Sequence, residues 1–315
     1  MARIDEYLQG IRTVAIAGHV NPDGDCIGSC MGMYLYLRDN FPEIRAVVYL
    51  ESFRDVFSFI EGIGEAKNVC DPEPVDLLIL LDISSTSRIG VASPLLDTAG
   101  KTLCIDHHVT NKGTYTWFFN EPGASSASEV LYGFLDPEKV SQGCAAALYT
   151  GIVNDTGVFQ YSSTSPKTMC AAAELMKKGI PFTKIIEGTF FQKSYGQNRI
   201  LGKVLTESRL LFDGRVIIGC ASQEDMDTYQ VEAKEMDGIV SELRNTIGVD
   251  VAVFLYELGE GCVKASLRSR QYTDVSRVAQ ALGGGGHVRA AGCSVAGTLE
   301  EAEETIIAEL NKCLS

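Results

Sequence analysis

The amino-acid sequence predicts an α/β fold, with an N-terminal domain built on a doubly wound, mainly parallel sheet and a smaller C-terminal α+β domain. In the first half of the chain, short and nearly unbroken apolar runs alternate with segments of helical periodicity. This alternation is typical of parallel strands joined by crossover helices, because such strands are buried on both faces. Beyond about residue 200 the pattern alternates apolar and polar residues between tight turns, which is typical of antiparallel pairs.

The strands of the N-terminal domain are expected where β-branched residues and leucine dominate. They lie at residues 13–17, 44–50, 75–81 and 101–105, with a shorter strand near 115–119. Helices are expected at residues 28–40, 53–60, 142–153 and 165–178, and a further helix starts within 125–129, where serines precede an acid. Because strand and helix alternate, the carboxyl ends of the strands should meet at one edge of the sheet.

The C-terminal half is expected to form paired strands and a few helices. Asp213-Gly214 separates strands at 207–212 and 215–220, and Gly259-Glu260-Gly261 separates strands at 249–258 and 262–268. Helices are expected at 223–247 with a break, at 274–282 and at 298–313. The expected domains are residues 1–187 and 199–315, joined by a linker over 188–198.

Composition limits the class of protein. The chain of 315 residues carries a formal net charge of −14, and 45% of its residues are hydrophobic. This charge argues against a protein that grips long duplex nucleic acid, because such binding needs a basic surface. No apolar run approaches the ~20 residues of a membrane span, no secretory signal is evident, and the ten cysteines form no Cys-x-x-Cys pair. A cytoplasmic protein with reduced thiols and no membrane association is therefore expected.

Acids and imidazoles gather at the carboxyl ends of the predicted strands. The first strand leads into Gly18-His19-Val20-Asn21-Pro22-Asp23-Gly24-Asp25, the third ends at Asp82, the fourth ends at Asp106-His107-His108, and Asp155 follows the 142–153 helix. Pro22 and Gly24 are expected to keep the first of these turns non-helical. Since such turn residues are common without a ligand, that stretch alone is ambiguous. However, the chain has only four histidines and two are adjacent, which is not expected of scattered structural histidines.

Five carboxylates directed at one edge of a sheet would repel one another strongly unless cations neutralised them. Two divalent ions suit this number of ligands. A pair of metals in turn suits in-line phosphoryl transfer, because it generates a hydroxide near neutral pH and stabilises the attacking and leaving oxygens. Mixed His and Asp ligands favour Mn²⁺ over an all-oxygen Mg²⁺ site and lack the thiolates of structural zinc.

In their order along the chain, these motifs resemble those of the DHH phosphoesterase superfamily. The resemblance rests on His19-x-Asn-Pro-Asp23-x-Asp25, Asp82, Asp106-His107-His108 and Asn154-Asp155-Thr156-Gly157, together with Gly283–Gly286, His287, Arg289, Ala290 and Gly292, which are similar to the glycine-rich signature of the DHH-associated C-terminal domain. It covers nearly the whole chain. The chain most resembles the stand-alone bacterial nanoRNase/pAp phosphatase type, with cyclic-dinucleotide phosphodiesterases as near relatives.

The resemblance implies a role for each residue of the site. His19 and Asp23 would hold one Mn²⁺, Asp25, His107 and Asp155 would hold the other, and Asp82 would bridge the two, with Mg²⁺ or Co²⁺ as substitutes. His108 would contact the scissile phosphate and Asp106 would orient the imidazoles, so that His108, Asp106 and Asp82 are the expected catalytic residues. A bridging hydroxide would attack phosphorus without a protein nucleophile. The role of Asp106 stays open, because this residue can also cap a backbone turn.

Substrate contacts are expected from both domains. The candidates are Arg88, Arg268, Arg270, Gly284, Gly285, Gly286 and His287. The glycines let backbone N–H groups approach an anion, and strand alternation puts Arg268 and Arg270 on one face, where they can bind a phosphate. A solvated surface position is an equal alternative for Arg270, and Arg88 can instead pair with nearby acids.

The predicted function is Mn²⁺-dependent hydrolysis of short oligoribonucleotides (nanoRNA) to mononucleotides, as an exonuclease, or removal of the 3′-phosphate of 3′-phosphoadenosine 5′-phosphate (pAp). Three alternatives remain: a phosphodiesterase of dinucleotides such as pApA or c-di-AMP, an inorganic pyrophosphatase or exopolyphosphatase, and an idle nucleotide-binding module. The expected partners are short RNA or a mononucleotide. The sequence leaves open the ranking of substrates, the direction of degradation, and whether the chain forms a homodimer.

Overall fold

The chain forms two units, each with its own sheet and hydrophobic core. The computed structural model describes residues 3–71, 73–236, 238–259 and 261–314. One unit extends to Gln192 and the other begins at Lys193. The outer ends of the expected domains, residues 1 and 315, lie outside the described residues, as does Glu260 of the expected Gly259–Gly261 turn.

The first unit contains a parallel sheet, which confirms the predicted fold class. In the described residues its strand order is β2-β1-β3-β4-β5, and every pair of neighbours is parallel. The strands are β1 (Thr13–Ala17), β2 (Arg45–Tyr49), β3 (Leu77–Leu81), β4 (Lys101–Asp106) and β5 (Trp117–Asn120). All residues of β3 are buried, and they alternate between the cores on its two faces. Burial on both faces explains the unbroken apolar run in the sequence.

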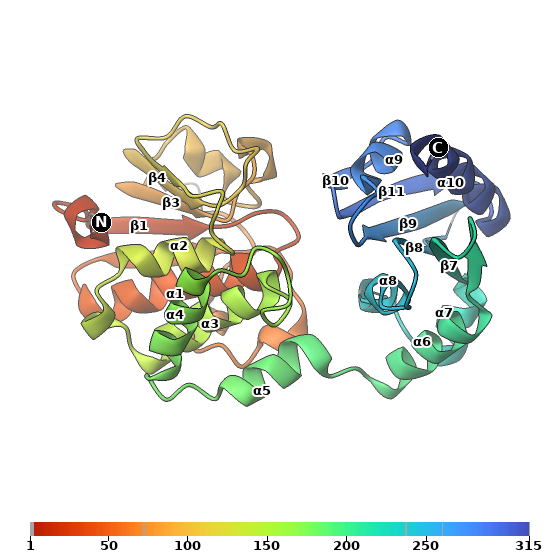
Figure 1. Cartoon of the computed structure of the whole chain (residues 1–315). Helices are drawn as coiled ribbons and strands as arrows, with labels where there is room; N and C mark the ends of the chain where they lie inside the picture. Colours follow the sequence, from red (N-terminus) through yellow and green to blue (C-terminus); the bar gives the residue numbers. More distant parts are fainter. Residues whose placement is uncertain (1–2, 72, 237, 260, 315) are drawn as a thin grey trace. The chain divides into compact units, whose positions relative to one another are not determined.

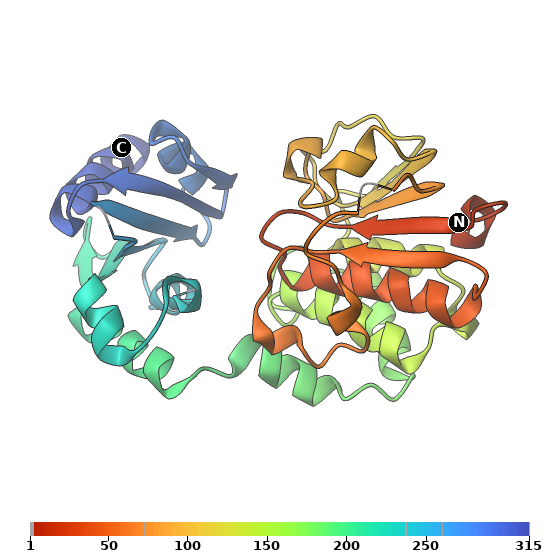
Figure 2. The same ribbon diagram turned by 180° about the vertical axis from the view of Figure 1, so that it is seen from behind.

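Helices cover one face of this sheet in both views (Figures 1 and 2). They are α1 (Gly24–Asn40), α2 (Ala127–Phe134) and α3 (Gln142–Asp155), and α4 (Pro166–Met176) and the short α5 (Phe182–Ile186) pack against these helices on the same side. Glycines allow α1 and α3 to lie close together, since a Cβ at Gly28 would lie 2.5 Å from the Ala147 carbonyl oxygen. A π-helical turn, Glu187–Phe191, follows α5.

Short 3₁₀ turns enclose the smaller core on the other face of the sheet, for example Thr86–Arg88 and Ser93–Leu96. The expected helix at residues 53–60 is wrong, because the structure has only one 3₁₀ turn there, Asp55–Phe57. Phe57 and Ile60 are both buried in the first unit's main core. The chain then turns through a left-handed Gly62, so the segment cannot continue as a helix.

The helix after β1 begins four residues earlier than expected. Gly24 and Asp25 lie in the first turn of α1 rather than in a non-helical loop, which corrects the role expected for Gly24. The cause is Asp23, whose Oδ1 accepts hydrogen bonds from the backbone N–H groups of Asp25 and Cys26, each at 3.1 Å. A carboxylate at this N-cap position satisfies donors that the helix leaves unpaired and allows it to start at Gly24.

The second unit is α+β, as predicted. Its mixed sheet has the order β10-β11-β9-β8-β7-β6 over the described residues, and only β7 and β8 pair in parallel. The strands are β6 (Arg209–Leu211), β7 (Val216–Ala221), β8 (Val251–Glu257), β9 (Cys262–Ser269), β10 (Gly285–His287) and β11 (Ala290–Ala296). The helices are α6 (Tyr195–Glu207), α7 (Gln223–Tyr229), α8 (Ile239–Arg244), α9 (Val275–Ala281) and α10 (Leu299–Leu314). Both predicted hairpins are confirmed by the antiparallel pairs β6–β7 and β8–β9. In neither unit is any described helix both long and apolar enough to cross a bilayer.

Candidate metal centre

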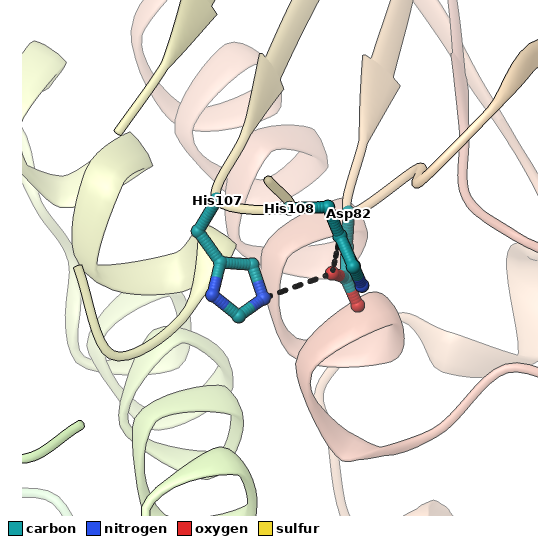
Figure 3. Close-up of side chains that lie close together, drawn as sticks. All are labelled: Asp82, His107 and His108. Carbon is teal, nitrogen blue, oxygen red and sulfur yellow. Dashed lines mark ion pairs between the residues drawn. The ribbon is translucent and has the colours of Figure 1, made fainter. Parts of the chain in front are cut away.

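The acids and imidazoles expected at one edge of the sheet do lie together. Asp82 directly follows β3, and His107 and His108 directly follow β4, so that their side chains meet beyond the strand ends (Figure 3). Asp155 is the last residue of α3 and reaches the same place from the helical layer. Asp82 has a left-handed backbone with φ of 58°, a conformation that costs about 1–3 kcal/mol in a non-glycine residue and is frequent at functional sites.

Asp82 is the centre of this cluster. One of its oxygens, Oδ2, lies 3.4 Å from Nε2 of His19, and the other, Oδ1, lies 3.4 Å from Nε2 of His107. On the first side, Asp23 Oδ2 lies 3.7 Å from the same His19 nitrogen. On the second side, His107 Nε2 lies 3.3 Å from Asp155 and 4.0 Å from Asp25.

These residues form groups that can hold metal ions. His19, Asp23 and Asp82 have ligand atoms within 4.8 Å of one another, and so do Asp25, His107 and Asp155. A third combination, Asp82 with His107 and His108, meets the same criterion. Asp82 belongs to the first group, and its Oδ1 also lies next to His107 of the second group. Its carboxylate is therefore placed to serve two ions.

The donor set fits divalent cations. Asp82 is only 3% exposed, yet its Oδ1 accepts no hydrogen bond from any described residue. A buried carboxylate oxygen without a donor is costly unless a cation neutralises it. Carboxylate and imidazole ligands without thiolate suit Mn²⁺ and related hard or borderline ions.

Burial among like charges perturbs the titration of the site. Burial and the nearby Asp82 raise the pKa of Asp25 to about 7, and burial raises the pKa of Asp155 well above its usual range. Burial disfavours the charged form of His19, but the neighbouring carboxylates of Asp23 and Asp82 outweigh it and raise the pKa to about 12. Without metal, this cluster therefore retains protons that cations at the same positions would displace.

The first turn of α2 holds the Asp25 carboxylate. Asp25 is fully buried, and the backbone N–H groups of Ala127 and Ser128 donate to its Oδ2 and Oδ1 at 2.6 and 3.0 Å. The sequence predicts this helix start but not its contact with Asp25, because the two segments are about a hundred residues apart. Gly151 was also missed, although a Cβ there would lie 2.6 Å from Asp25 Oδ1.

Asp106 contacts one of the two adjacent imidazoles. Its Oδ1 lies 2.8 Å from Nδ1 of His108, and the residue is fully buried. It is therefore placed to orient His108, whereas the described residues show no hydrogen bond or ion pair between its carboxylate and the His107 ring. Its other oxygen, Oδ2, accepts a hydrogen bond from Nδ2 of Asn111 at 2.8 Å, and Asn111 belongs to none of the sequence motifs.

Arg88 lies on the segment beside His19. Its backbone carbonyl accepts a hydrogen bond from Val20 at 2.8 Å, and the next residue, Ile89, pairs with His19 in an isolated bridge. Arg88 is exposed. The backbone thus places Arg88 next to the residues that follow β1, where a cation can meet an anionic substrate.

The predicted substrate residues of the second unit occupy different settings. Arg268 is half-buried on β9, but the strand ends at Ser269, so Arg270 lies outside it. The Arg270 N–H donates to the Asp250 carbonyl oxygen at 2.8 Å, which extends the pairing of Ser269 with Val251 by one residue. Ser269 is buried, whereas Arg268 is half-buried and Arg270 is exposed, and a shared face for the two arginines stays a prediction.

Part of the glycine run Gly283–Gly286 lies in a β-strand. Gly285 and Gly286 belong to β10 with His287, and they pair with β11. Glycine is required at two positions, because a Cβ at Gly284 would lie 2.3 Å from the Gly292 carbonyl oxygen and Gly286 has a φ of 140°. His287 is exposed at the end of this edge strand.

Asp250 anchors the loop that carries Arg270. Burial opposes its ionisation, but the Thr273 hydroxyl and the N–H groups of Gln271, Tyr272 and Thr273 outweigh burial and lower its pKa. We expect Asp250→Asn to lower the free energy of unfolding by about 1–3 kcal/mol at pH 7, because an N–H group would replace a charged acceptor. A depressed pKa stabilises the fold above the unfolded value of about 4, and this stabilisation is lost as the pH falls through the folded value.

The difference in melting temperature between Asp250→Asn and the parent should therefore be largest near neutral pH and shrink in acid. Asp227→Asn is the matched control, since Asp227 is exposed on α7 and, among the described residues, its carboxylate accepts only from the Gln223 side chain. An Asp250→Asn protein as stable as the parent at pH 7 would contradict the anchoring role.

Comparison with known proteins agrees with this geometry. A sequence profile described as the DHH family, N-terminal domain, matches residues 13–152, and one described as the DHHA1 domain matches residues 214–315. The bifunctional oligoribonuclease and PAP phosphatase NrnA of Thermus thermophilus is 31% identical over 98% of this chain and 92% of its own length. The chain belongs to the DHH family. As a DHH phosphoesterase it is a hydrolase that acts on phosphoester bonds.

Other relatives of this DHH protein extend the comparison. NrnA of Bacillus subtilis is 25% identical, with 90% of this chain and 89% of the relative aligned. The cyclic-di-AMP phosphodiesterase PdeA of Listeria monocytogenes is 27% identical over 98% of this chain but only 49% of its own length. Among solved structures, an exopolyphosphatase-related protein from Bacteroides fragilis matches with a TM-score of 0.90 and 25% identity, covering 98% of this chain and 94% of that one.

Proposed function

We propose that this DHH protein hydrolyses short oligoribonucleotides to mononucleotides and removes the 3′-phosphate of pAp. The observation that carries the proposal is the shared position of Asp82 between two groups of potential metal ligands. Similarity over nearly the full length to relatives named oligoribonuclease and PAP phosphatase supports the choice of substrate.

Two divalent ions, Mn²⁺ in the proposal, would be held by residues of the first unit. His19 and Asp23 would bind one, Asp25, His107 and Asp155 would bind the other, and Asp82 would bind both. When bound, such a pair supplies a hydroxide near neutral pH and stabilises the charge that develops on the attacking and leaving oxygens. No protein nucleophile is needed.

The protein's own groups orient this chemistry. The α2 backbone holds Asp25 through both of its oxygens, which leaves the carboxylate little freedom to rotate. Asp106 holds His108 by its Nδ1, so that His108 keeps a fixed orientation towards the scissile phosphate. Arg88, and in the second unit Arg268, Arg270, His287 and the backbone of Gly284–Gly286, would bind the phosphates and the nucleotide end of the substrate.

The charge of the chain agrees with a small substrate. At a formal net charge of −14, the surface does not favour the many phosphate contacts that long nucleic acids require. A nucleotide or a few linked nucleotides can instead be held by two metal ions and a small number of arginines.

A substrate panel tests the proposal. Release of phosphate from pAp, and of mononucleotides from RNA of two to five nucleotides, should occur with Mn²⁺ and stop with a chelator. pApA, c-di-AMP and pyrophosphate belong in the same panel, because a PdeA relative and an exopolyphosphatase-related neighbour make these the alternatives. A protein that turned over only c-di-AMP or pyrophosphate, or that bound nucleotide without turnover, would contradict the proposal.

Metal binding should also stabilise the first unit. We expect Mn²⁺ at a hundred times its dissociation constant to stabilise the native state by about 2.7 kcal/mol for each site, because the ions bind the folded cluster and not the unfolded chain. Thermal melting of chelator-treated protein, with and without Mn²⁺, measures the change. Ca²⁺ at the same concentration controls for general ionic effects, and an unchanged melting temperature with Mn²⁺ would contradict the metal site.

A further inference from the structure

Asn111 links the two loops that carry Asp82 and His108. It lies in the loop after β4 and is only 4% exposed. Its side-chain Nδ2 donates to the Ile83 carbonyl oxygen at 2.6 Å and to Asp106 Oδ2 at 2.8 Å. Ile83 follows Asp82 in the chain, and Asp106 lies two residues before His108, so one amide group is bonded to both loops.

The orientation of this amide is fixed. Its Oδ1 accepts the N–H of Gly113 at 3.0 Å, while two oxygen acceptors and the Cys104 sulfur face Nδ2. A flipped amide would place its oxygen against both the Ile83 carbonyl and the Asp106 carboxylate and would leave the Gly113 N–H facing a donor. The side chain therefore has one orientation that satisfies all its partners.

Asp106 is held between Asn111 and His108. Its Oδ2 accepts from Asn111 and its Oδ1 lies 2.8 Å from Nδ1 of His108. Asp82 Oδ1 lies farther from the same His108 nitrogen, at 3.6 Å. The shorter contact pairs Nδ1 with Asp106. It therefore disfavours metal binding by this nitrogen together with Asp82 and His107.

We propose that Asn111 is a positioning residue for the DHH reaction: it fixes Asp106, which holds the proton of His108 on Nδ1 and leaves the role at the scissile phosphate to Nε2. The same amide, through Ile83, keeps the Asp82 loop in register with the His107-His108 loop. This inference rests on the proposed function only for its kinetic readout, since the tautomer of His108 is a property of the resting protein.

The first test is the ring tautomer in the parent protein. Two-dimensional ¹⁵N–¹H spectra of the imidazole rings, recorded at pH 8 with diamagnetic Mg²⁺, distinguish a proton on Nδ1 from one on Nε2. The chain has only four histidines, and the His108 signals are assigned by their loss in His108→Gln. A proton on Nδ1 is expected, whereas a ring with its only proton on Nε2 would overturn the proposal.

The second test is Asn111→Asp, which keeps the size of the side chain but removes the donor and places a second carboxylate beside Asp106. The expected result is a fall of about 10–100-fold in kcat for pAp hydrolysis, a KM within about threefold, and a mixture of His108 tautomers. Asn111→Ser serves as a second variant if the two carboxylates prevent folding.

Asn40→Asp is the matched control. Its Nδ2 also donates to two groups, the Tyr36 and Lys139 carbonyl oxygens, but these lie outside the site. We expect a comparable loss of thermal stability with parental kcat and an unchanged His108 spectrum. Parental kcat in a folded Asn111 variant would overturn the positioning role, whereas a parent without turnover but with the Nδ1 tautomer would overturn the proposed function alone.

Discussion

Replacement of Asp82 by Asn should reduce phosphoester hydrolysis by about 10³-fold or more, because loss of the carboxylate that we propose as a ligand of both ions would remove several kcal/mol of transition-state stabilisation, and each 1.4 kcal/mol is tenfold in rate. Asp82 is the residue that contacts both His19 and His107, so no other single substitution should disturb both metal positions. Asn keeps the shape of the side chain but carries no charge. Calorimetric titration with Mn²⁺ should show fewer than two bound ions, and phosphate release from pAp measures the rate.

Asp76→Asn provides the control for this variant. Asp76 lies just before the opposite end of the same strand, where its Oδ2 accepts the N–H groups of Arg12 and Thr13 at 2.9 Å. Loss of this carboxylate should lower the melting temperature while leaving Mn²⁺ stoichiometry and rate as in the parent. Full activity in Asp82→Asn would show that the centre does not depend on a shared ligand.

Gly151→Ala should have the second-largest effect, although the residue makes no side-chain contact of its own. An added Cβ would lie 2.0 Å from Ser128 Oγ and 2.6 Å from Asp25 Oδ1, both fully buried. Ser128 or Asp25 must therefore move. Overpacking of this kind costs about 1–3 kcal/mol of stability, and a displacement of about 1 Å in a positioned group can lower the rate about 10²-fold.

The variant should thus lose both stability and Mn²⁺ affinity, measured by thermal melting and calorimetry. Gly143→Ala is the control on the same helix, because the three atoms nearest to a Cβ there belong to the exposed Glu61 side chain, which can swing away. An Ala at Gly143 should leave metal binding unchanged. If Gly151→Ala bound two ions with parental affinity, the tight packing between α3 and Asp25 would have no functional role.

The sequence by itself determined the parallel sheet and the identity of the residues at its edge. The apolar runs, such as Leu77–Leu81, are buried on both faces, so their composition alone predicts a central strand of a parallel sheet. The polar residues that follow them, Asp82 and His107 among them, are placed by the topology of parallel strands, whose carboxyl ends share an edge. The sequence pattern of these strands therefore predicts where their ends lie in the fold, because strand direction and crossover handedness leave few alternative topologies.

Helix boundaries and strand ends were decided by side chains that local pattern does not reveal. The start of α1 depends on the Asp23 carboxylate as a cap. The turn that follows β9 depends on the carboxylate of Asp250, which lies about twenty residues earlier in the chain and accepts the N–H groups of Gln271 and Tyr272. Both outcomes follow from hydrogen bonds that become available only once the two partners are brought together.

Only the tertiary structure showed which groups hold the site residues in place. The Asp25 carboxylate accepts a hydrogen bond from the α2 backbone, and it leaves no room for a Cβ at Gly151. Asp106 accepts a hydrogen bond from Asn111. These partners are distant in sequence or carry no motif of their own, since a backbone N–H or a missing Cβ leaves no mark in a residue pattern. The sequence determined which residues gather at the edge of the sheet, and long-range packing and hydrogen bonds decided how each one is oriented.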